Sequence, residues 1–266
     1  MDERARPACS VSLLGGFECR HHGAPVALPL TSQRVVAFLA LHERPVLRAH
    51  VAGVLWPDSS QRRASGNLRS ALWRLARFPF TLLVASSTHL GVDPAVAVDL
   101  REFDRDVRAI GGGGTAPSPD VVNRLLLAGD LLPEWDEDWL TMEREAVRQL
   151  RFHVGELLSR ELAGRGRFIE ATRVALSLIA AEPLRESSHR SLIEVFLVEG
   201  NLVEALRQYG RYRDLVRAEL GVEPSNALRQ VLLDAMRARD GSNAALLPVI
   251  DLERDGGLAA TGPRHT

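Results

Sequence analysis

The sequence predicts a mostly α protein with a small β part, in which an N-terminal winged helix-turn-helix domain precedes an all-α, tetratricopeptide-like domain. Three observations predict this fold class. The 266 residues are enough for about two domains. Two short strands, three helices and a hairpin follow one another in the first 95 residues. From about residue 99 onward, one helical pattern follows another.

The winged-helix elements follow from turns and apolar runs. After a flexible start over residues 1–10, short strands are expected on either side of a turn at His21, His22 and Gly23. Thr31 is expected to cap the first helix, Pro57 to end the second, and Asp58 or Ser59 to cap the third. The expected elements are strands at 11–17 and 26–28, helices at 34–41, 48–56 and about 59–77, and a hairpin of strands at 82–85 and 89–92.

The second half is predicted to be a series of helices. They are expected at about 99–109, 119–128, 136–163, 168–181, 185–198, 202–219 and 225–238, with a flexible joint at the glycines 111–114. Residues 166–171 and 200–205 share the pattern Gly-x-apolar-apolar-Glu-Ala at an offset of 34, which is the tetratricopeptide period. The alternative is an ordinary array of helical hairpins.

These patterns predict a winged-helix domain over 11–95 and a helical domain over 96–239. Residues 240–266 carry scattered Gly, Asp and Pro without a sustained period, and they are expected to form a disordered tail.

Charge is unevenly distributed between the two halves. Residues 1–95 hold 11 Arg and six acidic residues, whereas residues 96–266 hold 22 Arg and 28 acidic residues. All 33 basic residues are Arg, a side chain suited to phosphate and to guanine. The basic half therefore favours a polyanionic partner, and the acidic half does not.

The third predicted helix has two faces of different chemistry. At about 100° per residue, Ala64, Leu68, Ala71, Leu72 and Leu75 fall on one apolar stripe. The outward face and its flanks carry Arg62, Arg63, Asn67, Arg69, Ser70, Trp73, Arg74 and Arg77. In a major groove, Arg can reach guanine or phosphate, Asn can pair with adenine, and Ser can contact phosphate. We therefore expect double-stranded DNA as the partner of this face. The alternative is an ordinary solvated face.

Two further places are candidate DNA contacts. Thr88 and His89 lie at the small, polar tip of the predicted wing, where phosphates could bind. Arg34 lies with Ser32 and Gln33 at the start of the first helix, where free N–H groups favour an anion. Ordinary turn and capping roles are the alternative for both places.

No catalytic set, cofactor site or metal site is recognisable. His21 and His22 lack the Cys or carboxylate pair that would complete a metal site, and no Gly-Lys-Ser/Thr follows the glycine run. The acidic residues 136–138 are expected to begin a helix, on one face of which Trp135 and Trp139 pack. Cys9 and Cys19 are expected to be thiols. The chain is therefore expected not to be an enzyme and to need no cofactor.

The chain is expected to act in the cytoplasm and not at a membrane. Its opening residues are polar and charged, unlike a signal peptide. No segment approaches the ~20 consecutive apolar residues of a membrane helix.

Several motifs resemble those of a known family. Leu13-Leu-Gly-Gly-Phe17, Leu55-Trp-Pro57 and Asn67-Leu-Arg69 resemble the winged helix of the SARP-type (antibiotic regulatory protein) regulators of actinomycetes. Residues 129–135, Asp138-Trp139, 183–186 and 219–225 resemble that family's bacterial transcriptional activator domain. The resemblance covers about residues 11–238. Ser65 and Ser32-Gln33 depart from it, since the family often carries basic residues at these positions.

This resemblance implies a transcription regulator. We expect an activator that binds tandem repeats in promoters, associates with itself on DNA and contacts RNA polymerase. The alternative is a tetratricopeptide-type adaptor for other proteins, whose winged helix no longer binds DNA. The basic face over residues 62–77 favours the first of these functions.

Overall fold

The computed structural model describes residues 8–111, 118–127 and 129–238. The chain divides into two compact units between Val154 and Gly155. The expected boundary between residues 95 and 96 therefore lies inside the first unit. The expected joint at 111–114 begins at Gly111, the last residue of α4; its other residues and the expected tail from residue 240 lie outside the described residues.

The winged-helix part contains two small sheets. The first has the strand order β3-β2-β1-β7, in which β7 pairs parallel with β1 and the other pairs are antiparallel. The second has the order β4-β6-β5 and is antiparallel throughout. The strands are β1 (Cys9–Ser12), β2 (Glu18–His21), β3 (Ala24–Pro25), β4 (Val46–Leu47), β5 (Leu83–Ala85), β6 (His89–Val92) and β7 (Val96–Val98). The predicted hairpin is present as β5 and β6. The bounds expected for the first strands are wrong: β1 ends at Ser12, Gly15 and Gly16 turn the chain with positive φ, and β2 and β3 occupy 18–21 and 24–25 in place of the single strand expected at 26–28. β4 and β7 are too short to give a periodic signal in the sequence.

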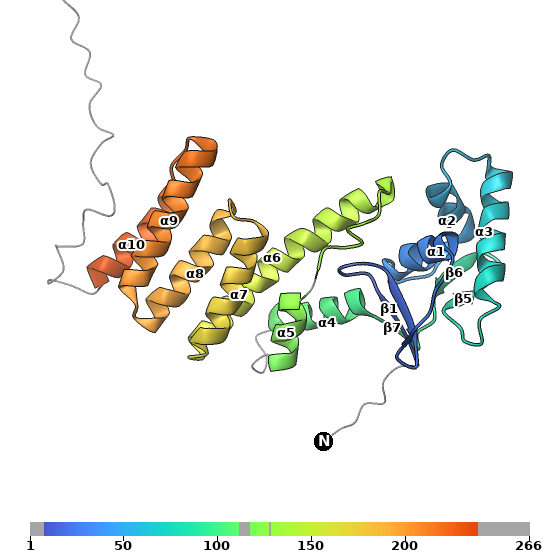
Figure 1. Cartoon of the computed structure of the whole chain (residues 1–266), viewed down its shortest axis with the longest axis horizontal. Helices are drawn as coiled ribbons and strands as arrows, with labels where there is room; N and C mark the ends of the chain where they lie inside the picture. Colours follow the sequence, from blue (N-terminus) through green and yellow to red (C-terminus); the bar gives the residue numbers. More distant parts are fainter. Residues whose placement is uncertain (1–7, 112–117, 128, 239–266) are drawn as a thin grey trace, which may run out of the picture. The chain divides into compact units, whose positions relative to one another are not determined.

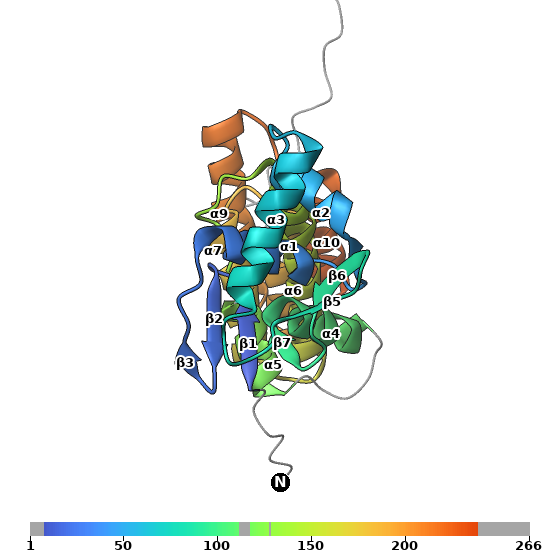
Figure 2. The same ribbon diagram turned by 90° about the vertical axis from the view of Figure 1, so that its right-hand side faces the viewer.

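Three helices complete this part in the predicted order: α1 (Leu30–Ala40), α2 (Arg48–Leu55) and α3 (Gln61–Leu75) (Figure 1). Seven of the eleven residues of α1 are buried, so this helix forms the core on which the others pack. α1 begins at Leu30 without a side-chain cap, so the expectation that Thr31 caps it is wrong. Figure 2 shows α3 lying in front of α1. The buried side of α3 consists of Ala64, Leu68, Ala71 and Leu75, which belong to the predicted apolar stripe.

The remainder of the first unit contains α4 (Asp99–Gly111), α5 (Pro119–Leu127), the 3-10 turn η1 (Asp138–Leu140) and the first part of α6 (Thr141–Gly164). The sequence predicted a helix from residue 136, and this is wrong, because Glu137 has an extended backbone and α6 begins at Thr141. Trp135 precedes η1 and Trp139 lies within it, so they do not share a helix face. Both side chains pack on the winged helix, and these tertiary contacts outweigh local helix propensity.

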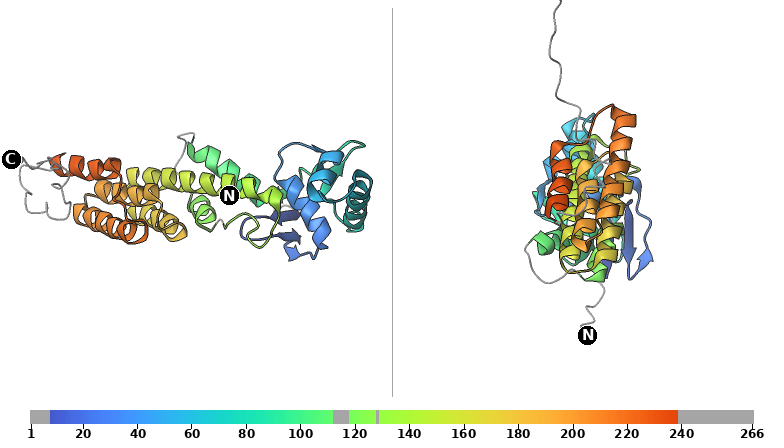
Figure 3. Two further views of the ribbon diagram at one scale, coloured as in Figure 1. Left: turned by 90° about the horizontal axis from the view of Figure 1, so that it is seen from above. Right: turned by 90° about the vertical axis from the view of Figure 1, so that its left-hand side faces the viewer.

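The second unit contains the rest of α6 and four further helices, α7 (Phe168–Ala181), α8 (Glu186–Glu199), α9 (Leu202–Leu220) and α10 (Asn226–Ala238). In Figure 3, α7 to α10 lie one beside the next. The two halves of the 34-residue repeat have equivalent structures. Gly166 and Gly200 both have positive φ, at 74° and 85°, and the alanines at the matched positions 171 and 205 are fully buried.

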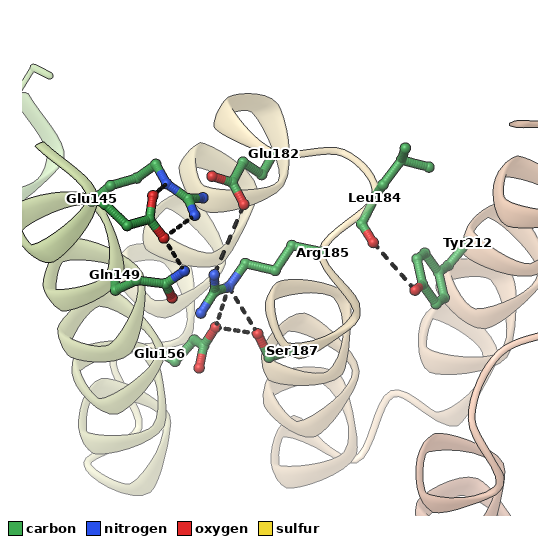
Figure 4. A network of polar contacts seen from close by, with 9 residues as sticks. Glu145, Gln149, Glu156, Glu182, Leu184, Arg185, Ser187 and Tyr212 are labelled. Atoms are coloured by element: carbon green, nitrogen blue, oxygen red, sulfur yellow. Dashed lines mark hydrogen bonds and ion pairs between the residues drawn. The ribbon is translucent and has the colours of Figure 1, made fainter. Parts of the chain in front are cut away.

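A polar network joins the helices of the second unit (Figure 4). The Nε of Arg185 lies 3.4 Å from Oε1 of Glu156, and the hydroxyl of Ser187 donates to the same oxygen at 2.6 Å. Glu156 is buried, so its charge needs these partners. The Tyr212 hydroxyl donates to the carbonyl of Leu184 at 3.4 Å. These bonds link α6, the α7–α8 turn and α9.

Within the residues that the structure describes, no helix has both the length and the apolar composition required to cross a membrane.

Candidate nucleic-acid interface

The outward face of α3 is exposed as the sequence predicted. All eight candidate side chains in this region are exposed to solvent: Arg62, Arg63, Asn67, Arg69, Ser70, Trp73, Arg74 and Arg77. Arg77 lies two residues beyond the end of α3 at Leu75. The helix has no acidic residue in its first turn. The structure therefore brings these residues together on one basic, exposed surface, here called the α3 face.

The residues of the α3 face differ in what holds them. Nη1 of Arg74 donates to the Thr31 hydroxyl at 3.0 Å, and the Ser70 hydroxyl donates to its own helix, at the carbonyl of Gly66, at 3.1 Å. Within the described part of the chain, four polar side chains of the face have no hydrogen bond or ion pair: Arg62, Arg63, Asn67 and Arg69. Three of these four lie in the first half of α3, the half with which recognition helices usually read bases.

The far end of the α3 face carries an exposed aromatic side chain. Trp73 is 63% exposed, which is unusual for so large an apolar group. The guanidinium carbon of Arg77 lies 5.1 Å from the centre of the Trp73 ring, in a cation–π contact. This contact restrains Arg77, although its residue lies beyond the helix end.

The wing tip is a compact turn. The Ser86 hydroxyl oxygen accepts from the amides of Thr88 and His89, at 3.2 and 2.9 Å. Thr88 is exposed, and its hydroxyl lies 2.9 Å from Nδ1 of His89. These local bonds fix the tip, so both candidate residues occupy defined positions on an element that packs on α1 through β6.

Arg48, the first residue of α2, is bonded to the wing, and sequence reasoning missed it. Its backbone amide donates to the carbonyl of Thr88 at 2.8 Å, and its guanidinium donates to the carbonyl of Ser86 at 3.3 Å. A cavity of about 640 Å³ opens beside the wing and is lined by Arg44, Pro45, Val84, Ala85, Ser86 and His89. The signal in the sequence was the basic residues Arg44 and Arg48, just before and at the start of the second predicted helix.

The Arg34 side chain is bonded within the protein and does not form an open anion site. Its Nη2 donates to the Glu137 carboxylate at 2.7 Å and to the carbonyl of Leu55 at 2.9 Å, and its Nε lies 2.6 Å from the same carboxylate in an ion pair. Ser32 is fully buried, and Gln33 donates to the carbonyl of Leu28 at 2.7 Å. All three side chains expected at an anion site are thus engaged within the protein.

No metal or redox chemistry is indicated in the described residues. No group of three or more His, Cys, Asp or Glu side chains there is arranged to hold a metal ion. Cys9 and Cys19 are free, buried thiols, as predicted. Burial raises the pKa of the Cys19 thiol to about 11, so this side chain stays protonated and unreactive near neutral pH.

Three comparisons with known proteins bear on this surface and fold. Residues 124–233 match the bacterial transcriptional activator domain. The chain is 25% identical over 243 residues to the regulatory protein AfsR of Streptomyces coelicolor, covering 86% of this chain but 24% of AfsR. The chain thus spans about a quarter of the length of that curated relative.

The third comparison concerns the fold. The structure resembles that of EmbR from Mycobacterium tuberculosis, solved in complex with a low-affinity phosphopeptide, with a TM-score of 0.66 and 22% identity. The likeness covers 88% of this chain and 66% of EmbR. It supports the fold class of a small β-containing N-terminal part followed by a helical domain.

Proposed function

We propose that the chain is a SARP-type transcription regulator with a bacterial transcriptional activator domain, and that it binds specific sequences of duplex DNA through the α3 face. In this proposal the winged helix contacts DNA, with α3 in the major groove and the wing at the backbone. The helical domain contacts proteins. The proposed site of action is the bacterial cytoplasm, where the DNA is.

One observation carries this proposal. Arg62, Arg63, Asn67 and Arg69 are exposed, close in sequence on one helix, and without partners among the described residues. If the Arg residues of α3 served only to keep the helix soluble, acidic residues one turn away would stabilise it. Such Arg–Glu pairs, four residues apart, are present on other helices of this chain. The only acidic residue between residues 58 and 80 is Asp58, so the charge on α3 suits an external polyanion.

Finer features of the proposal rest on the family and on charge. Regulators of this family act on direct repeats, so two copies would lie head-to-tail on tandem half-sites and touch through different surfaces. The acidic half of the chain would supply contacts to the second copy or to RNA polymerase, because it does not compete for phosphate.

The test is selection of binding sites by the full chain from a library of random duplexes. The proposal predicts that one motif is enriched and that binding to it falls steeply between about 50 and 200 mM salt, as phosphate contacts release counterions. Enrichment of no motif would reject sequence-specific binding. Binding that is also absent at low salt would favour the adaptor function, in which the winged helix no longer contacts DNA.

A further inference from the structure

Residues 129–140, which precede α6, pack on the winged helix although they lie within the region matched as an activator domain. We propose that this 129–140 segment positions the DNA-reading helix and that Glu137 is its positioning residue. The inference rests on the proposed function, because its consequence is measured as sequence-specific DNA binding.

The backbone of the 129–140 segment pairs with the end of β1. The amide of Gly15 donates to the carbonyl of Asp130 at 2.8 Å, and the amide of Leu132 donates to the carbonyl of Leu13 at 2.9 Å. Leu14 and Leu131 form an antiparallel bridge between these bonds. Two stretches more than a hundred residues apart in the sequence are therefore joined like neighbouring strands.

Two aromatic contacts extend the pairing. The ring of Trp135 stacks on Phe17 with centroids 5.8 Å apart, and Trp139 meets the ring of Phe38 in α1 edge-on at 5.4 Å. From the other side, the Arg144 guanidinium in α6 donates to the carbonyls of Leu131, Leu132 and Trp135. The segment is thus held between the winged helix and the start of α6.

The Arg34–Glu137 ion pair connects this segment to the turn that precedes α3. Both side chains are 20% exposed. Nη2 of Arg34 donates to Oε2 of Glu137 at 2.7 Å, and Nε lies 2.6 Å from Oε1 in an ion pair without hydrogen-bond geometry. The indole N–H of Trp139 donates to the same carboxylate at 2.8 Å. Arg34 also donates to the carbonyl of Leu55, the last residue of α2. Because this carbonyl lies at the helix end, no amide of α2 is available to donate to it.

The position of Arg34 explains why the pair can affect DNA binding. Its guanidinium carbon lies 6.0 Å from the centre of the Trp56 ring, and Trp56 begins the short turn from α2 to α3. Arg34 therefore bonds the end of α2 while Glu137 fixes Arg34. Loss of the carboxylate would release the restraint on this turn, and with it the orientation of the α3 face.

The test compares Glu137→Gln with Asp136→Asn in the full chain. Both substitutions remove one negative charge, but Asp136 is exposed and has no hydrogen bond or ion pair among the described residues. From charge alone, both variants would bind DNA as well as the wild type or better. A positioning role predicts that only Glu137→Gln loses affinity for the selected duplex, by about fivefold to thirtyfold, while affinity for random duplex is retained.

A double-substitution cycle separates positioning from direct contact by Arg34. If the ion pair acts as a unit, Arg34→Gln and Glu137→Gln each lower the ratio of selected to random binding, and the double variant is no worse than either one. If Arg34 instead contacts phosphate, Arg34→Gln weakens both duplexes alike and the two effects add. Equal affinities in Glu137→Gln and wild type would overturn the inference.

Amide hydrogen exchange, measured in the absence of DNA, tests the role of Glu137 independently of the proposed DNA binding. The amides of Trp56 and Ser59 are bonded to the carbonyls of Ala52 and Trp56 in the α2–α3 turn. They should exchange faster in Glu137→Gln than in Asp136→Asn. If Glu137→Gln does not fold, Trp139→Phe removes one donor to the carboxylate and should show the same changes more weakly. Unchanged exchange would contradict the role of Glu137 even if the wild type binds DNA.

Discussion

At the scale of single residues, the α3 face contains side chains with different degrees of restraint. Asn67 and Arg63 are exposed and unbonded among the described residues, which suits side chains that must adapt to base edges. Arg77 stacks on Trp73 beyond the helix end, which suits a phosphate contact at the edge of a groove.

Arg77→Ala is therefore expected to weaken binding to selected and random duplexes by similar factors. It should reduce the slope of log affinity against log salt by about 1, because one phosphate contact is lost. The matched control is Arg211→Ala, which removes an exposed Arg from α9. A loss confined to the selected duplex would reassign Arg77 to base reading.

His189 gives the second unit a pH-dependent stability. It is buried, with Nε2 at 2.7 Å from the carbonyl of Pro183 and Nδ1 at 2.8 Å from Nε2 of Gln208. Burial lowers its pKa in the folded state below the ordinary 6.5. The unfolded chain therefore takes up the proton first as the pH falls, so this contribution is complete above about pH 6.5 and is lost below it.

Melting temperatures of the wild type and His189→Gln at several pH values test this. The wild type should lose more stability than the variant between about pH 7.5 and about pH 5.5. The variant itself should be less stable at the higher pH, since it cannot reproduce both bonds of the imidazole. Parallel pH profiles would show that another group dominates.

The exposure of single side chains could be predicted from the sequence where the helical periodicity determines which side chains face outward. The apolar stripe of α3 determined which side chains face outward, and all eight candidates on or beside that helix are exposed. Arg34 could not be placed in the same way, because its partner Glu137 is distant in the sequence. An isolated helix pattern contains no information about such a pair.

At the scale of elements, helix positions were predictable wherever the helix buries its own amphipathic face. The four helices α7 to α10 begin and end within one residue of the predicted bounds. The start of α6 was not predictable, since residues 129–140 follow the winged helix to which they bind. β4 and β7 were missed for a related reason, because strands of two or three residues are defined by their partners.

Gly129 is expected to be essential to the pairing of the 129–140 segment with β1. A Cβ at this position would lie 2.6 Å from the Cα and 2.8 Å from the N of Gly15, and backbone cannot move aside cheaply. Gly129→Ala should lower the free energy of unfolding by about 1–3 kcal/mol, as overpacking does. It should also lower the ratio of selected to random DNA binding.

Gly53→Ala is the control for this substitution. Gly53 lies in α2, and a Cβ there would meet nothing within 4 Å. Alanine should stabilise the helix by up to about 1 kcal/mol. If chemical denaturation gave Gly129→Ala the stability of the wild type, the close approach of the two segments would be wrong.

At the scale of the whole molecule, the order of the parts was predictable and their packing was not. The switch from strands and a hairpin to successive helices gave the fold class, which the likeness to EmbR supports. Packing, however, divides the chain after Val154, because the first part of the activator-domain match binds the winged helix. Such long-range pairing has no local periodicity from which to predict it.

Tandem binding is a prediction about the whole protein. Two half-sites should lie about 10–10.5 bp apart, or a multiple of this, so that both copies lie on one side of the duplex. Insertion of about 5 bp between them should abolish cooperative occupancy, because it turns one copy to the opposite side. Unchanged occupancy would indicate that the copies bind as independent monomers.

The central claim is that the α3 face reads DNA sequence. The most direct measurement is the affinity of full-length wild type, Asn67→Ala, Arg63→Ala and the control Arg211→Ala for the selected duplex and for random duplex. Good base contacts predict a loss of about 1–3 kcal/mol for Asn67→Ala or Arg63→Ala on the selected duplex, with a much smaller loss on random duplex. Wild-type affinity in both variants, on a duplex that the wild type binds specifically, would contradict the claim.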